Sequence, residues 1–132
     1  MPLPLELALI TKLLNAVGID PEGVLADLTR EKTDKKMDVD AVVADMEEDG
    51  LTIKKLQPGG LGPDEKKELI RGAQFRLWRL VFSFKGGGHI ADAFRDKQQP
   101  KIVTAVEGQI DAGTKMTELV EAVKKATLDL TF

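Results

Sequence analysis

The stretch PDEKKELIRGAQFRLWRLVFSFK, residues 63–85, decides the fold. It opens with a proline and two carboxylates, which suit the first turn of a helix because no backbone N–H is needed there and the helix dipole favours negative charge. Apolar residues then recur at helical spacing in two neighbouring stripes. The first stripe is Ile70, Ala73, Leu77, Leu80 and Phe84, and the second is Phe75, Trp78 and Phe82. So much apolar surface predicts packing on several sides of this helix.

Shorter amphipathic segments on both sides predict a mainly α fold, with five to seven helices around this long central helix. Before it, Gly18 and Gly50 stand where two helices should end, because glycine readily adopts the left-handed conformation that follows a last helical turn. Asp20 followed by Pro21 predicts the N-cap and the first residue of a short helix.

After the central helix, the three glycines at 86–88 predict a turn. Residues 89–96 predict a short helix, and Pro100 is expected to interrupt the chain because proline cannot donate the helical hydrogen bond. Apolar spacing predicts a further helix over 102–110 and a last one that Thr114 caps.

The length and composition of the chain fit one globular domain. The 132 residues include 42% hydrophobic and 31% charged residues, a balance that allows a core and argues against disorder. We therefore expect a single helical domain over residues 1–132. The glycine-rich stretch at 57–62 is the best candidate for a hinge within it.

A change of period at the end of the chain predicts a different kind of element. Leu128, Leu130 and Phe132 alternate with polar residues, as in a strand. We expect this tail to pair with residues 51–56, in a small two-stranded β element over about 51–56 and 127–132, or to pack on the chain's own helices. Binding to a partner protein is the other possibility.

Charge and residue usage exclude several classes of function. A formal net charge of −3 gives no overall attraction to nucleic acid or to an anionic bilayer, and no apolar run is long enough for a transmembrane segment. The chain has no cysteine, which excludes thiolate nucleophiles and Cys-based metal sites. We expect no metal and no cofactor, and a location in the cytoplasm or within a particle assembled there.

His89 is the single histidine and the best candidate for a reactive group. Asp92 and Asp96 would share its helical face, but a site of this kind would lack the supporting groups that hold ligands in place. The glycines before His89 do not match a phosphate-binding loop, since the pattern Gly-x-x-x-x-Gly-Lys-Ser/Thr is absent. An enzyme with a site near His89 is therefore the third hypothesis, and we expect no enzymatic activity.

Basic and aromatic residues alternate along 66–85, a composition that suits an anionic surface or nucleic acid as well as a buried helix. The cations spread around the helix, so nucleic acid is not the expected partner. A nucleic-acid or anionic-surface binding module that uses residues 66–85 is therefore the alternative hypothesis. The candidate anion-binding residues are Lys67, Arg71, Arg76, Arg79 and Lys85.

The surplus of apolar residues favours a non-catalytic structural or assembly protein that acts through protein–protein contacts. Its partners would be other proteins or further copies of the chain, in a homo-oligomer or a larger particle such as a bacteriophage virion or one of its assembly components. The second aromatic stripe should meet either the first helix or a neighbouring subunit. The candidate interface residues are Phe75, Trp78, Phe82, Leu128, Leu130 and Phe132.

Overall fold

The computed structural model describes residues 5–30, 37–53, 62–83, 87–111 and 113–130. None of these residues forms a β-strand. The chain is therefore mainly α-helical, as the sequence predicts. Its helices are α1 (Leu5–Ala16), α2 (Pro21–Arg30), α3 (Val39–Glu48), α4 (Pro63–Val81), α5 (Gly87–Val106), the short 3-10 helix η1 (Glu107–Gln109) and α6 (Met116–Leu128).

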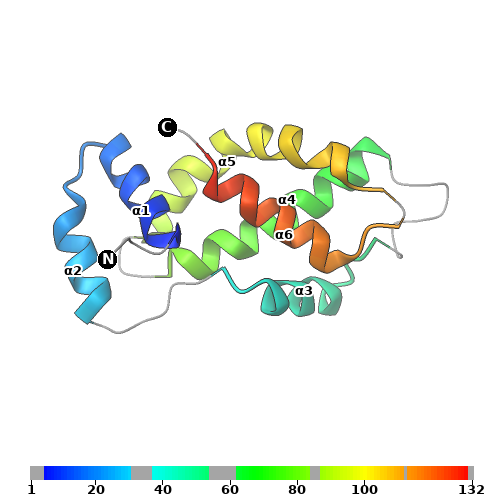
Figure 1. Cartoon of the computed structure of the whole chain (residues 1–132), viewed down its shortest axis with the longest axis horizontal. Helices are drawn as coiled ribbons and strands as arrows, with labels where there is room; N and C mark the ends of the chain where they lie inside the picture. Colours follow the sequence, from blue (N-terminus) through cyan, green and yellow to red (C-terminus); the bar gives the residue numbers. More distant parts are fainter. Residues whose placement is uncertain (1–4, 31–36, 54–61, 84–86, 112, 131–132) are drawn as a thin grey trace.

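The helices pack in two parts that share one core. α4 lies against α3, α5 and α6 (Figure 1). α1 and α2 form a helical hairpin at one end of the molecule, where α1 reaches α5 and α6 while α2 packs mainly against α1 (Figure 1). The hairpin is therefore tied to the other helices through α1.

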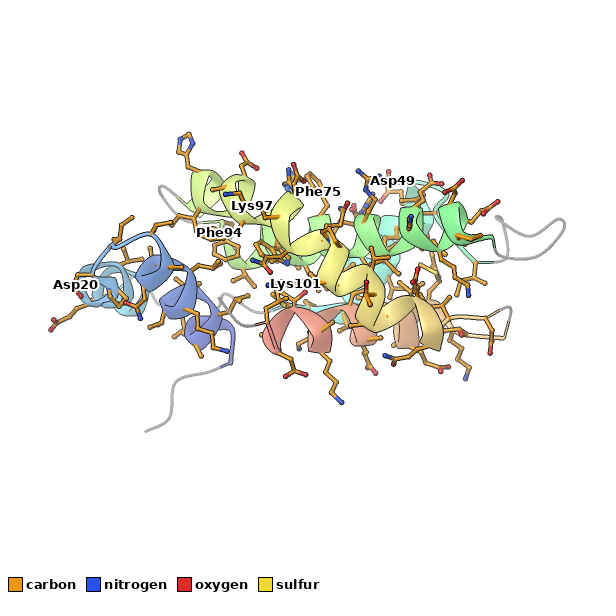
Figure 2. The ribbon with its side chains drawn as sticks, turned by 90° about the horizontal axis from the view of Figure 1, so that it is seen from above. Asp20, Asp49, Phe75, Phe94, Lys97 and Lys101 are labelled. Atoms are coloured by element: carbon orange, nitrogen blue, oxygen red, sulfur yellow. The ribbon has the colours of Figure 1, made fainter. Side chains whose placement is uncertain are left out.

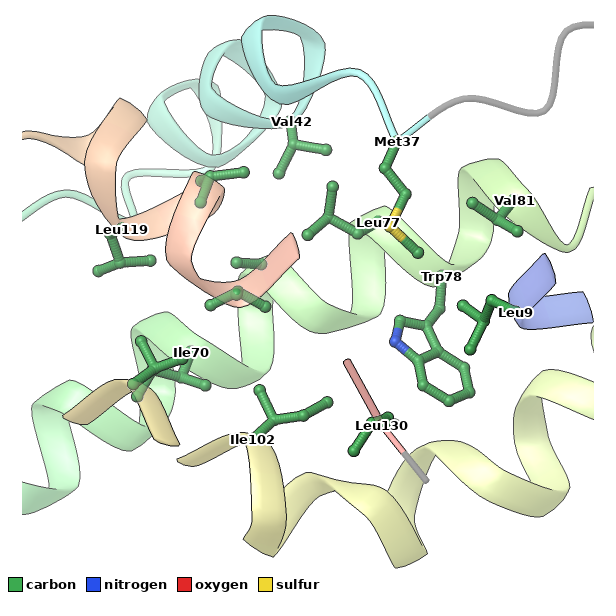
Figure 3. Close-up of a cluster of buried hydrophobic side chains, with 14 of the residues drawn as sticks. Leu9, Met37, Val42, Ile70, Leu77, Trp78, Val81, Ile102, Leu119 and Leu130 are labelled. Carbon is green, nitrogen blue, oxygen red and sulfur yellow. The ribbon is translucent and has the colours of Figure 1, made fainter. Parts of the chain in front are cut away.

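One cluster of buried side chains joins α1 and α3 to α4, α5 and α6. The indole of Trp78 is fully buried and lies between Leu9 of α1 and Leu130, which follows α6 (Figure 3). Its ring meets that of Phe82 in a tilted arrangement, with 5.4 Å between the ring centroids. α1 contributes four fully buried side chains, Leu9, Ile10, Leu13 and Leu14.

Two glycines end helices as the sequence predicts. Gly18 and Gly50 have φ angles of 75° and 79°, which side chains with a Cβ rarely adopt. After α1, the N–H of Ile19 donates to the carbonyl of Leu14 at 2.9 Å, and the equivalent bond after α3 is 2.8 Å long. These bonds satisfy carbonyls that the last helical turns leave without a partner.

α4 is shorter than the helix predicted over 63–85. It begins at Pro63, as predicted, but ends at Val81. Two residues later the hydroxyl of Ser83 donates to the carbonyl oxygen of Leu80 at 3.0 Å, and this bond satisfies one carbonyl of the last turn. The final two residues of the predicted helix lie outside the described part of the chain.

α5 continues through Pro100 as one helix, so the predicted interruption there is wrong. Proline removes the hydrogen bond to the carbonyl of Asp96, but side chains tie this region to α4. The buried amide Nε2 of Gln74 donates to the carbonyl of Arg95 at 3.0 Å. The Nε2 of Gln99 donates in turn to Oε1 of Gln74 at 3.3 Å.

The expected strand at 127–132 does not form in the described residues, because Thr127 and Leu128 are the last two residues of α6. The hydroxyl of Thr127 donates to the carbonyl of Val123 at 2.8 Å, so this residue follows the helical pattern. Residues 51–53 form no strand either. The remaining residues of the predicted pair, 54–56 and 131–132, lie outside the described ranges, as does the candidate hinge apart from Gly62.

Thr114 does not cap α6, contrary to expectation. Lys115 is the N-cap residue and makes no side-chain cap bond. The hydroxyl of Thr114 instead accepts the backbone N–H of Asp111 at 2.9 Å, within the turn that follows η1.

Candidate functional site

A groove between α3 and α4 has a volume of about 400 Å³. Its apolar part comes from Val42, which belongs to the core, and from Leu80, which is 36% exposed. Charged and polar side chains from both helices surround these residues. The residues lining this α3–α4 groove are Ala41, Val42, Asp45, Arg76, Arg79, Leu80 and Ser83.

Arg76 fixes the two walls of the groove to one another. Its Nε donates to Oδ2 of Asp45 at 2.6 Å, and its Nη2 pairs with the carboxylate of Asp49. A third donor, Nη1, bonds to the carbonyl of Gly72 one turn earlier on α4 at 3.0 Å. The Arg76 side chain is only 15% exposed, so its charge holds α3 in place and is not available to a ligand.

Gly72 explains how α3 comes so close to α4 next to the groove. A Cβ at this position would lie 3.2 Å from Cδ1 of Leu51 and 3.5 Å from Cε of Met46. These side chains belong to the end of α3 and the residues just after it. The sequence alone does not indicate this role for Gly72, because a glycine inside a helical pattern can occur for several structural reasons.

Arg79 gives the groove an uncompensated positive charge. Its side chain is exposed, and no carboxylate among the described residues pairs with it. The charge of Arg76, by contrast, is balanced by Asp45 and Asp49. The groove thus combines an aliphatic part with one unpaired guanidinium.

A second groove, with a volume of about 590 Å³, lies between α4 and α5. Lys67 and Arg71, both exposed, stand one turn apart on α4. The facing side carries polar and apolar residues and one carboxylate, that of Glu107. The residues lining this α4–α5 groove are Pro63, Lys67, Arg71, Gln99, Pro100, Val103, Thr104 and Glu107.

The predicted anion-binding residues do not share one surface. Lys67 and Arg71 line the α4–α5 groove, whereas Arg79 lines the α3–α4 groove. Arg76 is held by two carboxylates, and Lys85 lies outside the described residues. Only two of the five cations therefore face a common cavity.

The predicted interface residues also differ in where they lie, because most of the described ones are buried and only one is largely exposed. Trp78 and Phe82 are buried in the chain's own core, where the indole lies beside Leu9 of α1 (Figure 3). Leu128 is half-buried and Leu130 is buried. Phe132 lies outside the described residues. The four buried or half-buried side chains of this set are therefore packed against the chain's own helices.

Phe75 is the one described member of that set with a large exposed fraction, 44%. The guanidinium of Arg95 lies over its ring, with Cζ 5.0 Å from the ring centroid. This cation–π contact joins α4 to α5 at the surface, where Phe75 lies (Figure 2), and covers part of its ring.

His89 is exposed near the start of α5. Its two candidate partners both lie near Arg95 on the same helix, with Asp92 at 3.4 Å and Asp96 at 3.7 Å from its guanidinium nitrogens. No cluster of three metal-ligating side chains occurs within the ranges that the structure describes.

Two aliphatic residues at the turn between α1 and α2 are exposed, although the apolar pattern of the sequence favoured packing for both. Val17 and Ile19 are 47% and 46% exposed, on either side of Gly18. Residues 17–22 form the tip of the hairpin, and Asp20 projects from its outer end (Figure 2). We call these residues the hairpin tip. The helical period of α1 continues to Val17, which is why the pattern alone indicated a buried residue there.

Comparison with protein-family models, with curated proteins and with solved structures found no match to this chain. Among the helices described, none is long and apolar enough to cross a bilayer.

Proposed function

We propose that this chain is a non-catalytic assembly protein that acts through protein–protein contacts, and that its α3–α4 groove receives a side chain of the partner. The observation that carries the proposal is the composition of the groove. Leu80 is exposed beside the apolar Val42, within a wall that Arg76 fixes by two ion pairs. A preformed apolar pocket with a polar rim is typical of the centre of a protein interface.

Other residues of the groove support a protein partner over a small polar ligand. Arg79 and Ser83 stand beside Leu80 at one edge, and arginine is enriched where interfaces contribute most of their binding energy. The remaining wall consists of Ala41 and Asp45 of α3. An aliphatic partner side chain flanked by a carboxylate would match both the apolar part and the unpaired guanidinium.

The proposal extends to a subunit of a homo-oligomer or larger particle located in the cytoplasm. A bacteriophage virion or assembly component is one instance of that class, and it stays a prediction. His89 has no role in this proposal. If the third hypothesis were right, replacing His89 with alanine would abolish an activity of the purified chain.

A photo-cross-linking experiment tests the groove in cells of the source organism. A photoreactive benzophenone side chain is introduced at position 80, and a matched control carries it at Glu121, which is exposed on α6. We expect adducts from position 80 and none, or different ones, from position 121. Adducts that are identical at both positions, or absent at position 80, would contradict a docking role for the groove.

Anion binding is the second candidate, and it is favoured by Lys67 and Arg71 lining the same cavity. Replacing both with alanine should abolish retention on an anionic resin, while the matched pair Lys97→Ala and Lys101→Ala, on exposed residues of α5, should leave it unchanged. Retention by the wild type must also fall steeply with salt. Equal losses in both double variants would indicate net charge alone and remove this candidate.

A further inference from the structure

The hairpin tip and the α3–α4 groove both expose aliphatic side chains. The tip exposes Val17 and Ile19 on either side of a sharp turn. The groove exposes Leu80 in a cavity of about 400 Å³, with the core residue Val42 at its lining. Aliphatic side chains leave water favourably when they enter such a cavity. Contact between the tip and the groove would therefore bury exposed apolar surface on both.

The charges next to these apolar residues are also complementary. Asp20 and Glu22 are exposed at the tip, directly after Ile19. The groove carries the unpaired guanidinium of Arg79, since Arg76 is already balanced by two carboxylates. A carboxylate of the tip that pairs with the guanidinium of Arg79 favours one register of docking over others.

The tip is preorganised for insertion. The N–H of Ile19 is bonded to the carbonyl of Leu14 at 2.9 Å, and the N–H of Glu22 is bonded to Oδ1 of Asp20 at 3.0 Å. These bonds fix the turn before any partner arrives. Docking therefore orders few additional backbone angles, which lowers the entropic cost of association.

We propose that the hairpin tip of one copy of this chain docks into the α3–α4 groove of a second copy. This inference rests on the proposed function and names its partner. Tip and groove are different surfaces of the same molecule, so the contact is head-to-tail. Each bound copy keeps one unused tip or groove, and association continues until a ring closes or a filament grows.

Sedimentation velocity with single-face variants tests the proposal. The tip variant carries Val17→Ser and Ile19→Ser, and the groove variant carries Leu80→Ser. The full-length wild type should gain mass between about 10 µM and about 1 mM, a range suited to a small interface. Each variant alone should associate at least about tenfold more weakly. Circular dichroism spectra must match the wild type in both variants.

Mixing the two variants gives the decisive measurement. Each retains one intact surface, so one tip and one groove can still meet. We expect the mixture to form a complex of two chains that does not grow further. A mixture that stays monomeric while the wild type associates would overturn the assignment of these surfaces, and a wild type that stays monomeric throughout would overturn self-association.

A charge exchange tests the register. Arg79→Glu should weaken association by about threefold, the size expected for a pair at the rim of an interface, and Glu22→Arg in the same chain should restore it. Restoration must shrink as salt is raised. Loss in both the single and the double variant would contradict the pairing of these two side chains.

The cross-link at position 80 separates this inference from the proposed function. An adduct with a second copy of the chain supports both. Adducts only with a different protein retain the proposed function and overturn self-docking. The absence of any specific adduct overturns both.

Discussion

Arg76 has a different role in the fold from the one that the sequence suggests. In the sequence it belongs to a row of cations on an aromatic helix, which suggests an anionic ligand. In the fold its guanidinium is mostly shielded and bonds to Asp45, to Asp49 and to the carbonyl of Gly72. Its exposed neighbour Arg79 keeps an unpaired charge. The two arginines are alike in sequence and differ in what they contact.

Replacing Arg76 with methionine should lower the free energy of unfolding by about 1 to 2 kcal/mol. The estimate is modest because the two carboxylates are 55% and 56% exposed and solvent weakens such pairs. Urea unfolding measures the change. The matched variant Arg79→Met should differ from the wild type by less than about 0.5 kcal/mol, and equal effects of the two variants would show that Arg76 does not anchor α3.

Trp78 and Phe75, both predicted as interface residues, should differ in how strongly their truncation destabilises the fold. Trp78→Ala should destabilise the fold by about 3 to 5 kcal/mol, because it removes a fully buried ring from the core. Phe75→Ala should cost about 1 kcal/mol or less, because its ring is 44% exposed and loses one cation–π contact. Thermal unfolding measures both changes in stability. Similar losses of stability in the two variants would contradict the difference in burial between Trp78 and Phe75.

At the scale of elements, α5 shows why a local rule can fail. Proline inside a helix normally marks an interruption, yet Pro100 lies within one continuous helix whose backbone is bonded to Gln74 of α4. Tertiary contacts of this kind are not encoded near the proline. The ends of α1 and α3, in contrast, depend on Gly18 and Gly50 alone, and the sequence was sufficient to predict them.

Pro100→Ala should stabilise the protein by about 1 kcal/mol or more. Alanine restores a donor for the carbonyl of Asp96 and has a far higher helix propensity, and Pro100 is exposed, so little packing is lost. The melting temperature measures the gain. Lys101→Ala, at the next exposed position on α5, should leave it nearly unchanged. A lower melting temperature for Pro100→Ala would mean that the fold depends on the geometry that proline imposes.

The faces of α4 were only partly predictable. Ile70, Ala73 and Leu77 are buried as expected, but Leu80 is 36% exposed while Trp78 is buried. Helical spacing identifies which residues share a stripe, and it cannot tell which stripe a neighbouring helix will cover. That choice depends on where α1 and α3 pack, which is a property of distant segments. The groove beside Leu80 was unpredictable for the same reason.

At the scale of the molecule, stability is distributed unevenly. α4 packs against α3, α5, α6 and η1, whereas α2 packs mainly against α1. α1 is anchored to the core by four fully buried side chains. α2 is held in place mainly by its contacts with α1. Helices with few tertiary contacts open more readily than those in the core.

Hydrogen–deuterium exchange should reflect this gradient. Backbone amides of α4 and α6 are expected to exchange slowest and those of α2 fastest, by at least about tenfold. Mass spectrometry of peptic fragments measures the rates. Equal protection of α2 and α4 would contradict the view that α2 depends mainly on α1. In a self-associated sample, added protection of the hairpin tip and of α3 would accompany docking.

The position of Trp78 gives the protein a natural optical reporter. It is the chain's one tryptophan. Its indole lies beside Leu9, and its Nε1 has no hydrogen-bond partner among the residues that the structure describes. Its fluorescence should therefore be shifted to the blue and shielded from aqueous quenchers while α1 is seated. Departure of α1 from the core would shift the emission to longer wavelengths. The seating of the hairpin can thus be followed in real time without any added dye.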